Sequence, residues 1–143
     1  MKTVIDILRA KGDEVYTVTP QVTVFDALKK MAENDIGALV VEEAGRVVGI
    51  FTERDYARKM ILKDRSSRDT PVRKVMTEHV ITVDPATTIE TCMDLMIYRH
   101  IRHLPVIENN RLIGLISIGD ILKAIFLGHV RLMEYQPNSF SGG

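Results

Sequence analysis

A hydroxyl and a carboxylate recur at one fixed spacing in two places of this chain. Thr52 precedes Asp55 in the motif GIFTERD, and Ser117 precedes Asp120 in the motif GLISIGD. At the start of a helix, such a pair either caps free backbone N–H groups or offers a ligand site, where the carboxylate accepts hydrogen bonds from vicinal hydroxyls such as those of ribose. Capping alone requires neither the glycine nor the two apolar residues that open both motifs. The repeated pattern therefore favours the ligand site.

The two motifs close two copies of one longer sequence. Residues 15–61 align with residues 80–126 without a gap. The identical positions, numbered in the first copy, are Val15, Thr17, Val18, Pro20, Thr23, Met31, Ile36, Leu39, Val41, Glu43, Arg46, Gly49 and Asp55. The leading segments also match if three residues are inserted, which aligns Val4, Ile7 and Leu8 with Val72, Val75 and Met76. The chain is therefore an internal duplication.

Each copy predicts the same order of elements. A short β-rich run is followed by a helix, which we expect to begin at Thr23 and at Thr87, because both have capping-box spacing to an acidic residue. Two apolar strands then flank a tight turn, at Gly45 in one copy and at Asn109–Asn110 in the other. The end of each motif opens an amphipathic helix.

The predicted fold class is α+β, with two β-α-β-β-α repeats packed sheet to sheet. One copy alone has too little core to be stable, so we expect the two to share a core around a pseudo-two-fold axis, with their helices outside. We place the first repeat at residues 1–65, a linker at 66–70 and the second repeat at 71–128. Residues 129–143 are expected to form a helix end and a disordered tail.

Composition limits the classes of function. Nineteen basic residues balance nineteen acidic ones, so no global field favours nucleic acid or an anionic membrane. The single Cys92 excludes an internal disulfide. The chain has no signal-peptide core and no apolar run long enough to span a bilayer, so we expect a soluble, cytoplasmic protein.

The segment RHIRHLPVIENNRLIGLISIGDIL and its weaker first-copy counterpart resemble a tandem pair of cystathionine-β-synthase (CBS) domains, also called a Bateman module. The resemblance covers residues 3 to about 127. It implies a stand-alone, non-catalytic regulatory module for signal transduction and energy sensing, with no required cofactor. The implied ligand is an adenosine nucleotide, such as AMP, ADP or ATP, or alternatively NAD or S-adenosylmethionine, bound in clefts between the two copies.

The resemblance also implies which residues would line each cleft. The first cleft would use Ile50, Thr52, Arg54 and Asp55 of the first motif, with Ile81, Ile101, Arg102 and His103 from the second copy. The second cleft would use Leu115, Ser117, Gly119 and Asp120 of the second motif, with Tyr16, Ile36 and Gly37 from the first copy. The aspartates would bind ribose, and Arg102 and His103 would bind phosphate. Arg99 and His100 are expected at a solvated helix end, and no metal site is expected.

The resemblance further implies partners. CBS pairs commonly associate through their helices into a flat disc, and the helix near Asp120 has a wide apolar surface: Ile121, Leu122, Ile125, Phe126 and Leu127. We therefore expect a homodimer that acts on an unidentified downstream protein, without a membrane partner.

Two other functions are weighed against this one. The first is a small enzyme that acts on a nucleotide, although the sequence shows no convincing nucleophile, acid–base pair or metal-ligand set. The second is a nucleic-acid-binding module that uses segment 53–74, which has eight basic and four acidic residues. A solvated helix and linker explain that segment better, so we expect no nucleic-acid partner.

Overall fold

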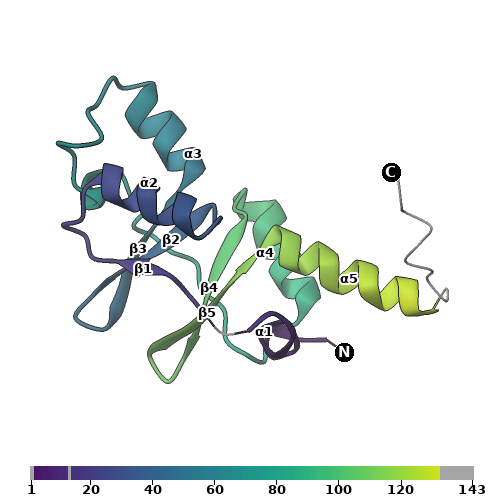
Figure 1. Ribbon diagram of the computed structural model, residues 1–143. Helices are drawn as coiled ribbons and strands as arrows, with labels where there is room; N and C mark the ends of the chain where they lie inside the picture. The colour runs from purple at the N-terminus through teal and green to yellow at the C-terminus, as the bar shows by residue number, and fades with distance from the viewer. Residues whose placement is uncertain (1, 13, 133–143) are drawn as a thin grey trace.

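The computed structural model describes residues 2–12 and 14–132, so the predicted tail after residue 132 lies outside the described residues. Figure 1 shows two units side by side, each a small sheet with helices on its outer face. The elements are α1 (Val4–Lys11), β1 (Thr17–Val18), α2 (Val24–Glu33), β2 (Ala38–Glu43), β3 (Arg46–Thr52), α3 (Glu53–Asp55), the π-helix η1 (Tyr56–Ile61), the 3₁₀-helix η2 (Val72–Lys74), α4 (Ile89–Arg99), β4 (His103–Glu108), β5 (Arg111–Ser117) and α5 (Ile118–Leu132).

The two sheets have matching topology, which confirms the predicted α+β fold of two repeats. In the first unit, β1 pairs parallel to β2, and β2 pairs antiparallel to β3. In the second unit, β4 pairs antiparallel to β5. A single parallel bridge between Val83 and Val106 takes the place of the β1–β2 pairing, because it matches the pairing of Val18 with Val41. Both hairpins have a register shift at the same repeat position, after Val41 and after Val106.

The two hairpin turns lie where the sequence predicts them. Ala44 and Gly45 both have positive φ, as do Asn109 and Asn110. Two consecutive positive φ angles define the two-residue turn whose twist matches that of paired strands, and asparagine and glycine adopt it at low cost.

One helix start differs from the prediction by one residue. Thr23 caps α2 and accepts a hydrogen bond from the Asp26 N–H. In the second copy, Thr88 caps α4 and accepts from the Thr91 N–H. The expected cap at Thr87 is therefore wrong: the Thr87 hydroxyl instead bonds within the preceding turn, and Thr88 is the repeat counterpart of Thr23.

The leading segments of the two copies are exchanged between the units. Val4 and Leu8 of α1 are buried in the core of the second unit. Val72 and Val75, around η2, are buried in the core of the first unit. Each segment is therefore close in sequence to one repeat but packs into the other.

Equivalent backbone hydrogen bonds hold the two exchanged segments. The Val4 N–H donates to the Thr87 carbonyl at 2.9 Å, and the Val72 N–H donates to the Val22 carbonyl at 2.8 Å. These bonds occupy the same places in the two copies once the three-residue insertion is allowed. The pseudo-two-fold symmetry therefore extends to the segments that cross between the units.

The exchange also explains the glycine that opens each motif. A Cβ added to Gly49 would lie 2.5 Å from Met76 Sδ, and one added to Gly114 would lie 2.6 Å from Leu8 Cδ2. Separations this short do not occur between packed atoms, so each glycine makes room for the other copy's leading segment. The glycine is therefore a packing requirement and gives no support to a ligand site.

The variant Gly114→Ala tests this packing. Its methyl group would press on Leu8, and overpacking of a core lowers the free energy of unfolding by about 1–3 kcal/mol. Urea denaturation measures the change. Gly119→Ala is the matched control, because its Cβ would meet only Ser117 Oγ at an ordinary 3.5 Å. Equal stability of the two variants would show that α1 does not pack on β5.

Candidate functional site

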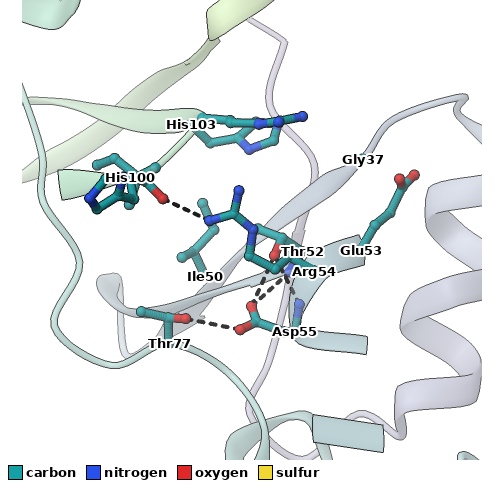
Figure 2. A pocket seen from close by; sticks show the side chains of 11 residues that line it. Gly37, Ile50, Thr52, Glu53, Arg54, Asp55, Thr77, His100 and His103 are labelled. Atoms are coloured by element: carbon teal, nitrogen blue, oxygen red, sulfur yellow. Dashed lines mark hydrogen bonds between the residues drawn. The ribbon is translucent and has the colours of Figure 1, made fainter. Parts of the chain in front are cut away.

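A cavity of about 290 Å³ lies where the first motif faces the second unit (Figure 2). It corresponds to the first cleft expected from the sequence. Its lining residues are Gly37, Ile50, Thr52, Glu53, Arg54, Asp55, Thr77, His100, Ile101, Arg102 and His103. The cavity therefore joins the carboxyl end of β3 to the residues between α4 and β4.

Thr52 and Asp55 of the first motif are held in position because together they cap the start of α3. The Thr52 hydroxyl accepts from the Asp55 N–H at 3.2 Å, and Asp55 Oδ2 accepts from the Thr52 N–H at 3.0 Å. In the second copy, Ser117 Oγ and Asp120 Oδ2 make the same reciprocal pair of bonds, at 3.1 and 2.9 Å. Capping boxes therefore form in both motifs, whatever else these residues do.

Asp55 is buried and surrounded by donors. Its second oxygen, Oδ1, accepts from the Thr77 hydroxyl at 3.1 Å and lies 3.0 Å from Lys59 Nζ. Thr77 is held in place because its backbone N–H and carbonyl both bond to Ile50 of β3. Figure 2 shows the three side chains of Thr52, Asp55 and Thr77 as one hydrogen-bonded group at the cavity wall.

Cations line the part of the cavity that faces the second unit. Arg54 crosses between the units, and its Nη1 donates to the His100 carbonyl at 2.7 Å (Figure 2). His100 has left-handed backbone angles because it ends α4, which turns its carbonyl toward Arg54. Arg102 and His103 follow it along the chain and add a second guanidinium group and an imidazole to the lining.

His103 has less tendency to hold a proton than an ordinary histidine. Burial lowers its pKa, the charge of Asp120 raises it, and the nearby charges of Lys11 and Arg102 lower it further, with a net lowering. Since the ordinary value is about 6.5 and the pKa of His103 lies below it, His103 is neutral at pH 7.

The second motif has a different neighbour. Lys11, the last residue of α1, directs its Nζ to Asp120 Oδ2 at 2.7 Å and to the Leu115 carbonyl at 2.9 Å. Burial alone would raise the pKa of Asp120, but hydrogen bonds from Lys11 and Ser117 outweigh burial and hold it below its usual value. Each aspartate therefore has a lysine partner, Lys59 for Asp55 and Lys11 for Asp120, but only Asp55 also accepts from the hydroxyl of a neighbouring segment, that of Thr77.

Both halves of the chain match one known family. The family model for the CBS domain fits residues 3–62 and residues 72–127. The chain belongs to the CBS domain family. Within this family it is a pair of CBS domains, a type of module with regulatory and signal-transduction functions.

Relatives of similar size support the assignment of a CBS pair. A CBS-domain protein of Burkholderia ambifaria MC40-6, assigned to signal transduction, is 49% identical, with a TM-score of 0.86 over 88% of this chain and 95% of that one. The mitochondrial CBS domain-containing protein CBSX3 of Arabidopsis thaliana is 42% identical over 99% of this chain and 73% of its own length. The CBS pair of protein MJ0100 has been solved with 5′-methylthioadenosine and S-adenosyl-L-methionine. It is 24% identical to this chain and has the same fold, with a TM-score of 0.78 over 90% of this chain and 98% of that one.

Most residues expected at the first cleft of the CBS pair lie together there, with exceptions. Gly37, expected at the second cleft, lines the first cleft. Ile81 does not line this cavity and packs against the core of the second unit. Tyr16 and Ile36, also expected at the second cleft, pack against the core of the first unit.

Three lining residues were not expected from the sequence. Glu53 lies inside the motif at a position that the two copies do not share. His100 is exposed at the end of α4, as expected, and it also lines the cavity, which was not expected. Thr77 lies outside the aligned motif, and its place depends on pairing with Ile50, a contact that no local pattern reveals.

Among residues 2–12 and 14–132, no three histidine, cysteine, aspartate or glutamate side chains are grouped so as to hold a metal ion. No helix in the same ranges has both the length and the apolar character needed to cross a membrane.

Proposed function

We propose that this CBS pair binds an adenosine nucleotide in the first cleft and passes the binding event to a partner protein. The observation that carries the proposal is the division of chemistry across one cavity. The first unit supplies hydroxyls and a carboxylate suited to a sugar, and Arg54 of the first unit joins Arg102 and His103 of the second as groups suited to phosphate. A solved protein of the same fold holds adenosyl ligands, so the fold accommodates this class.

The cavity suits the other parts of a nucleotide as well. Ile50 and Ile101 offer apolar surface from opposite units, which fits a flat purine ring. The volume of about 290 Å³ lies at the lower end of the range for small-molecule pockets, which favours a compact ligand such as a nucleoside monophosphate.

The ribose must share Asp55 with existing partners. Both carboxylate oxygens already accept hydrogen bonds, from Thr52 on one side and from Thr77 and Lys59 on the other. Threonine hydroxyls can both donate and accept, so a ribose hydroxyl can replace the Thr77 hydroxyl at Asp55 and bond to Thr77 in turn.

The phosphate would bind Arg54, Arg102 and His103. Arg54 now donates to a neutral carbonyl, and exchanging that acceptor for a phosphate oxygen gives a stronger, charge-assisted bond. Because the same movement releases the His100 carbonyl, ligand binding would change the contact that joins the two units. We propose this change as the signal that the partner protein senses.

Thermal shift followed by calorimetry tests the proposed function. AMP, ADP, ATP, adenosine, NAD and S-adenosylmethionine are compared at one concentration, because a ligand that binds only the folded state raises the melting temperature. We expect the phosphorylated adenosines to give the largest shifts and AMP to bind more tightly than adenosine. If none of the six raises the melting temperature, the proposed function is wrong.

The pH dependence of AMP binding tests the role of His103. A bound phosphate raises the lowered pKa of His103, so binding takes up a proton, and affinity should rise as the pH falls from 7 to about 6. Without ligand the sign is opposite: the folded pKa lies below the unfolded value, so the free energy of unfolding falls as the pH falls through about 6.5.

The matched control is His103→Asn, because the phosphate of AMP itself titrates near pH 6. Calorimetry of both proteins across this range separates the two contributions. Identical pH profiles for the wild type and His103→Asn would exclude His103 from phosphate binding.

We also propose that the protein is a homodimer that pairs through its helices. α4 and α5 pack together and leave exposed apolar side chains: Ile97, Tyr98, Leu122, Ile125, Phe126 and Leu127. Apolar groups gathered on one surface indicate an interface. Figure 1 shows α5 extending beyond the rest of the second unit, where a second chain can reach it.

Light scattering tests the homodimer. The wild type should have about twice the chain mass of 16.1 kDa. Leu122→Glu should move the mass toward one chain, because a two-fold axis would bring two carboxylates into an apolar contact. Arg111→Glu, at a hairpin turn away from these helices, is the control and should leave the mass unchanged. A wild-type mass of one chain at micromolar concentration would contradict the proposal.

A further inference from the structure

We propose that the chain binds a phosphorylated nucleotide in the first cleft only, and that Lys11 occupies the ribose position of the second cleft in place of a ligand. This inference rests on the proposed function, because it concerns how many of the two clefts take the nucleotide. Three observations carry it: the contacts of Lys11, its correspondence to Thr77, and the distribution of cations between the copies.

Lys11 holds the polar groups that a sugar would need at the second motif. Its ammonium group lies 2.7 Å from Asp120 Oδ2 and 2.9 Å from the Leu115 carbonyl oxygen. α1 ends at this residue, since Gly12 has a positive φ, and α1 packs on β5. The lysine is therefore delivered to the cleft by a helix whose own position is fixed by packing.

Lys11 replaces two donors that Thr77 supplies in the first cleft. The Thr77 backbone N–H donates to the Ile50 carbonyl, and its hydroxyl donates to Asp55. The single ammonium group of Lys11 makes both equivalent contacts, to the Leu115 carbonyl and to Asp120. The two clefts thus have the same pattern of acceptors, but the donor that contacts both acceptors is Thr77 in the first cleft and Lys11 in the second, while the lysine paired with Asp55 is Lys59, which follows the motif on the same helical segment.

The difference in donors decides whether a ribose can enter. A hydroxyl donates and accepts, so a ribose hydroxyl can take its place at a carboxylate and remain bonded to it. An ammonium group only donates, and its charge is neutralised by Asp120. A ribose in the second cleft would have to separate this ion pair without providing a counter-charge to either member.

The second cleft also lacks the cations of the first. Four cationic or titratable residues line the first cleft, namely Arg54, His100, Arg102 and His103. The residues at the matching repeat positions are Gly119, Asp35, Gly37 and Ala38, none of which is basic. Lys11 is already paired with Asp120, and His103, which interacts with the charge of Asp120, lines the first cleft, so the second cleft offers a phosphate fewer free cations than the first.

Calorimetric stoichiometry tests the inference on the intact chain. We expect the wild type to bind one AMP per chain. Lys11→Met should expose Asp120 and create a second site for adenosine, which has the ribose but no phosphate, with affinity there at least about tenfold tighter than in the wild type. Adding Asp120→Asn to Lys11→Met should remove the second adenosine site.

Two control variants separate the contact from a general loss of charge. Arg9→Met removes a positive charge from the exposed side of the same helix and should still bind one equivalent of each ligand. Lys11→Arg keeps the cation and should also remain at one equivalent. Circular dichroism and the melting temperature establish that each variant is folded.

The outcomes distinguish this inference from the proposed function. Two AMP molecules per wild-type chain, or no second adenosine site in folded Lys11→Met, would overturn the role of Lys11 and leave the first cleft as a nucleotide site. No AMP binding by any variant would overturn the proposed function and this inference with it.

Discussion

Asp55→Ala is expected to lower the free energy of unfolding by about 3 kcal/mol and to abolish AMP binding. The Asp55 side chain is 8% exposed and accepts hydrogen bonds from Thr52 and Thr77, so its removal leaves buried donors unpaired and Lys59 without its ion-pair partner. Urea denaturation measures the stability, and calorimetry of the variant at a temperature where it is folded measures affinity.

Two variants calibrate the Asp55 result. Asp55→Asn keeps an acceptor for the Thr52 N–H and should lose less stability than Asp55→Ala. Asp120→Ala removes a carboxylate that is more exposed, 20% against 8% for the Asp55 side chain, and should also lose less. A normal AMP affinity in folded Asp55→Ala would show that this residue only caps α3.

Arg102→Ala is expected to weaken AMP binding by about 10- to 100-fold while changing adenosine binding little. The guanidinium would contact only the phosphate, and hydrogen bonds to charged groups contribute about 1.5–3 kcal/mol each. Calorimetry with both ligands gives the two ratios.

Arg99→Ala is the control for Arg102→Ala. Arg99 is an exposed arginine in the last turn of α4, three residues before Arg102, and it does not line the first cleft. This variant should bind AMP and adenosine as the wild type does. Equal losses for both ligands in Arg102→Ala would mean that Arg102 shapes the cleft and does not bind the phosphate.

The repeat made much of the fold predictable from the sequence. The spacing of apolar residues, the turn residues and the two motifs predicted the β-α-β-β-α order, and the structure follows it in both copies except that the first strand of the second copy is reduced to a single bridge at Val83. These features are local, so each is determined by residues a few positions apart. The one-residue error at Thr87 arose because Thr87 has an acidic residue three positions on and Thr88 does not, although the repeat alignment with Thr23 points to Thr88, which is the cap.

The contacts that distinguish the two clefts could not be predicted in this way. Lys11 and Asp120 lie 109 residues apart, and no periodicity links a lysine near the start of the chain to the second motif. Thr77 reaches Asp55 only because the segment around η2 crosses to the first unit. The exchange of leading segments is a long-range property, and it decides which residues meet in each cleft.

That exchange constrains how such a chain could have arisen. A single repeat with its own leading segment would leave its core uncovered, because Leu8 or Val75 fills the core of the other unit. On separate chains, two such repeats could close their cores only by swapping these segments, as a domain-swapped dimer does. Joining them in one chain turns an association that depends on protein concentration into one within a single molecule, at an effective concentration set by the connection between them. After such a duplication the two repeats are always part of one molecule, and the residues that line the two clefts can change independently of each other.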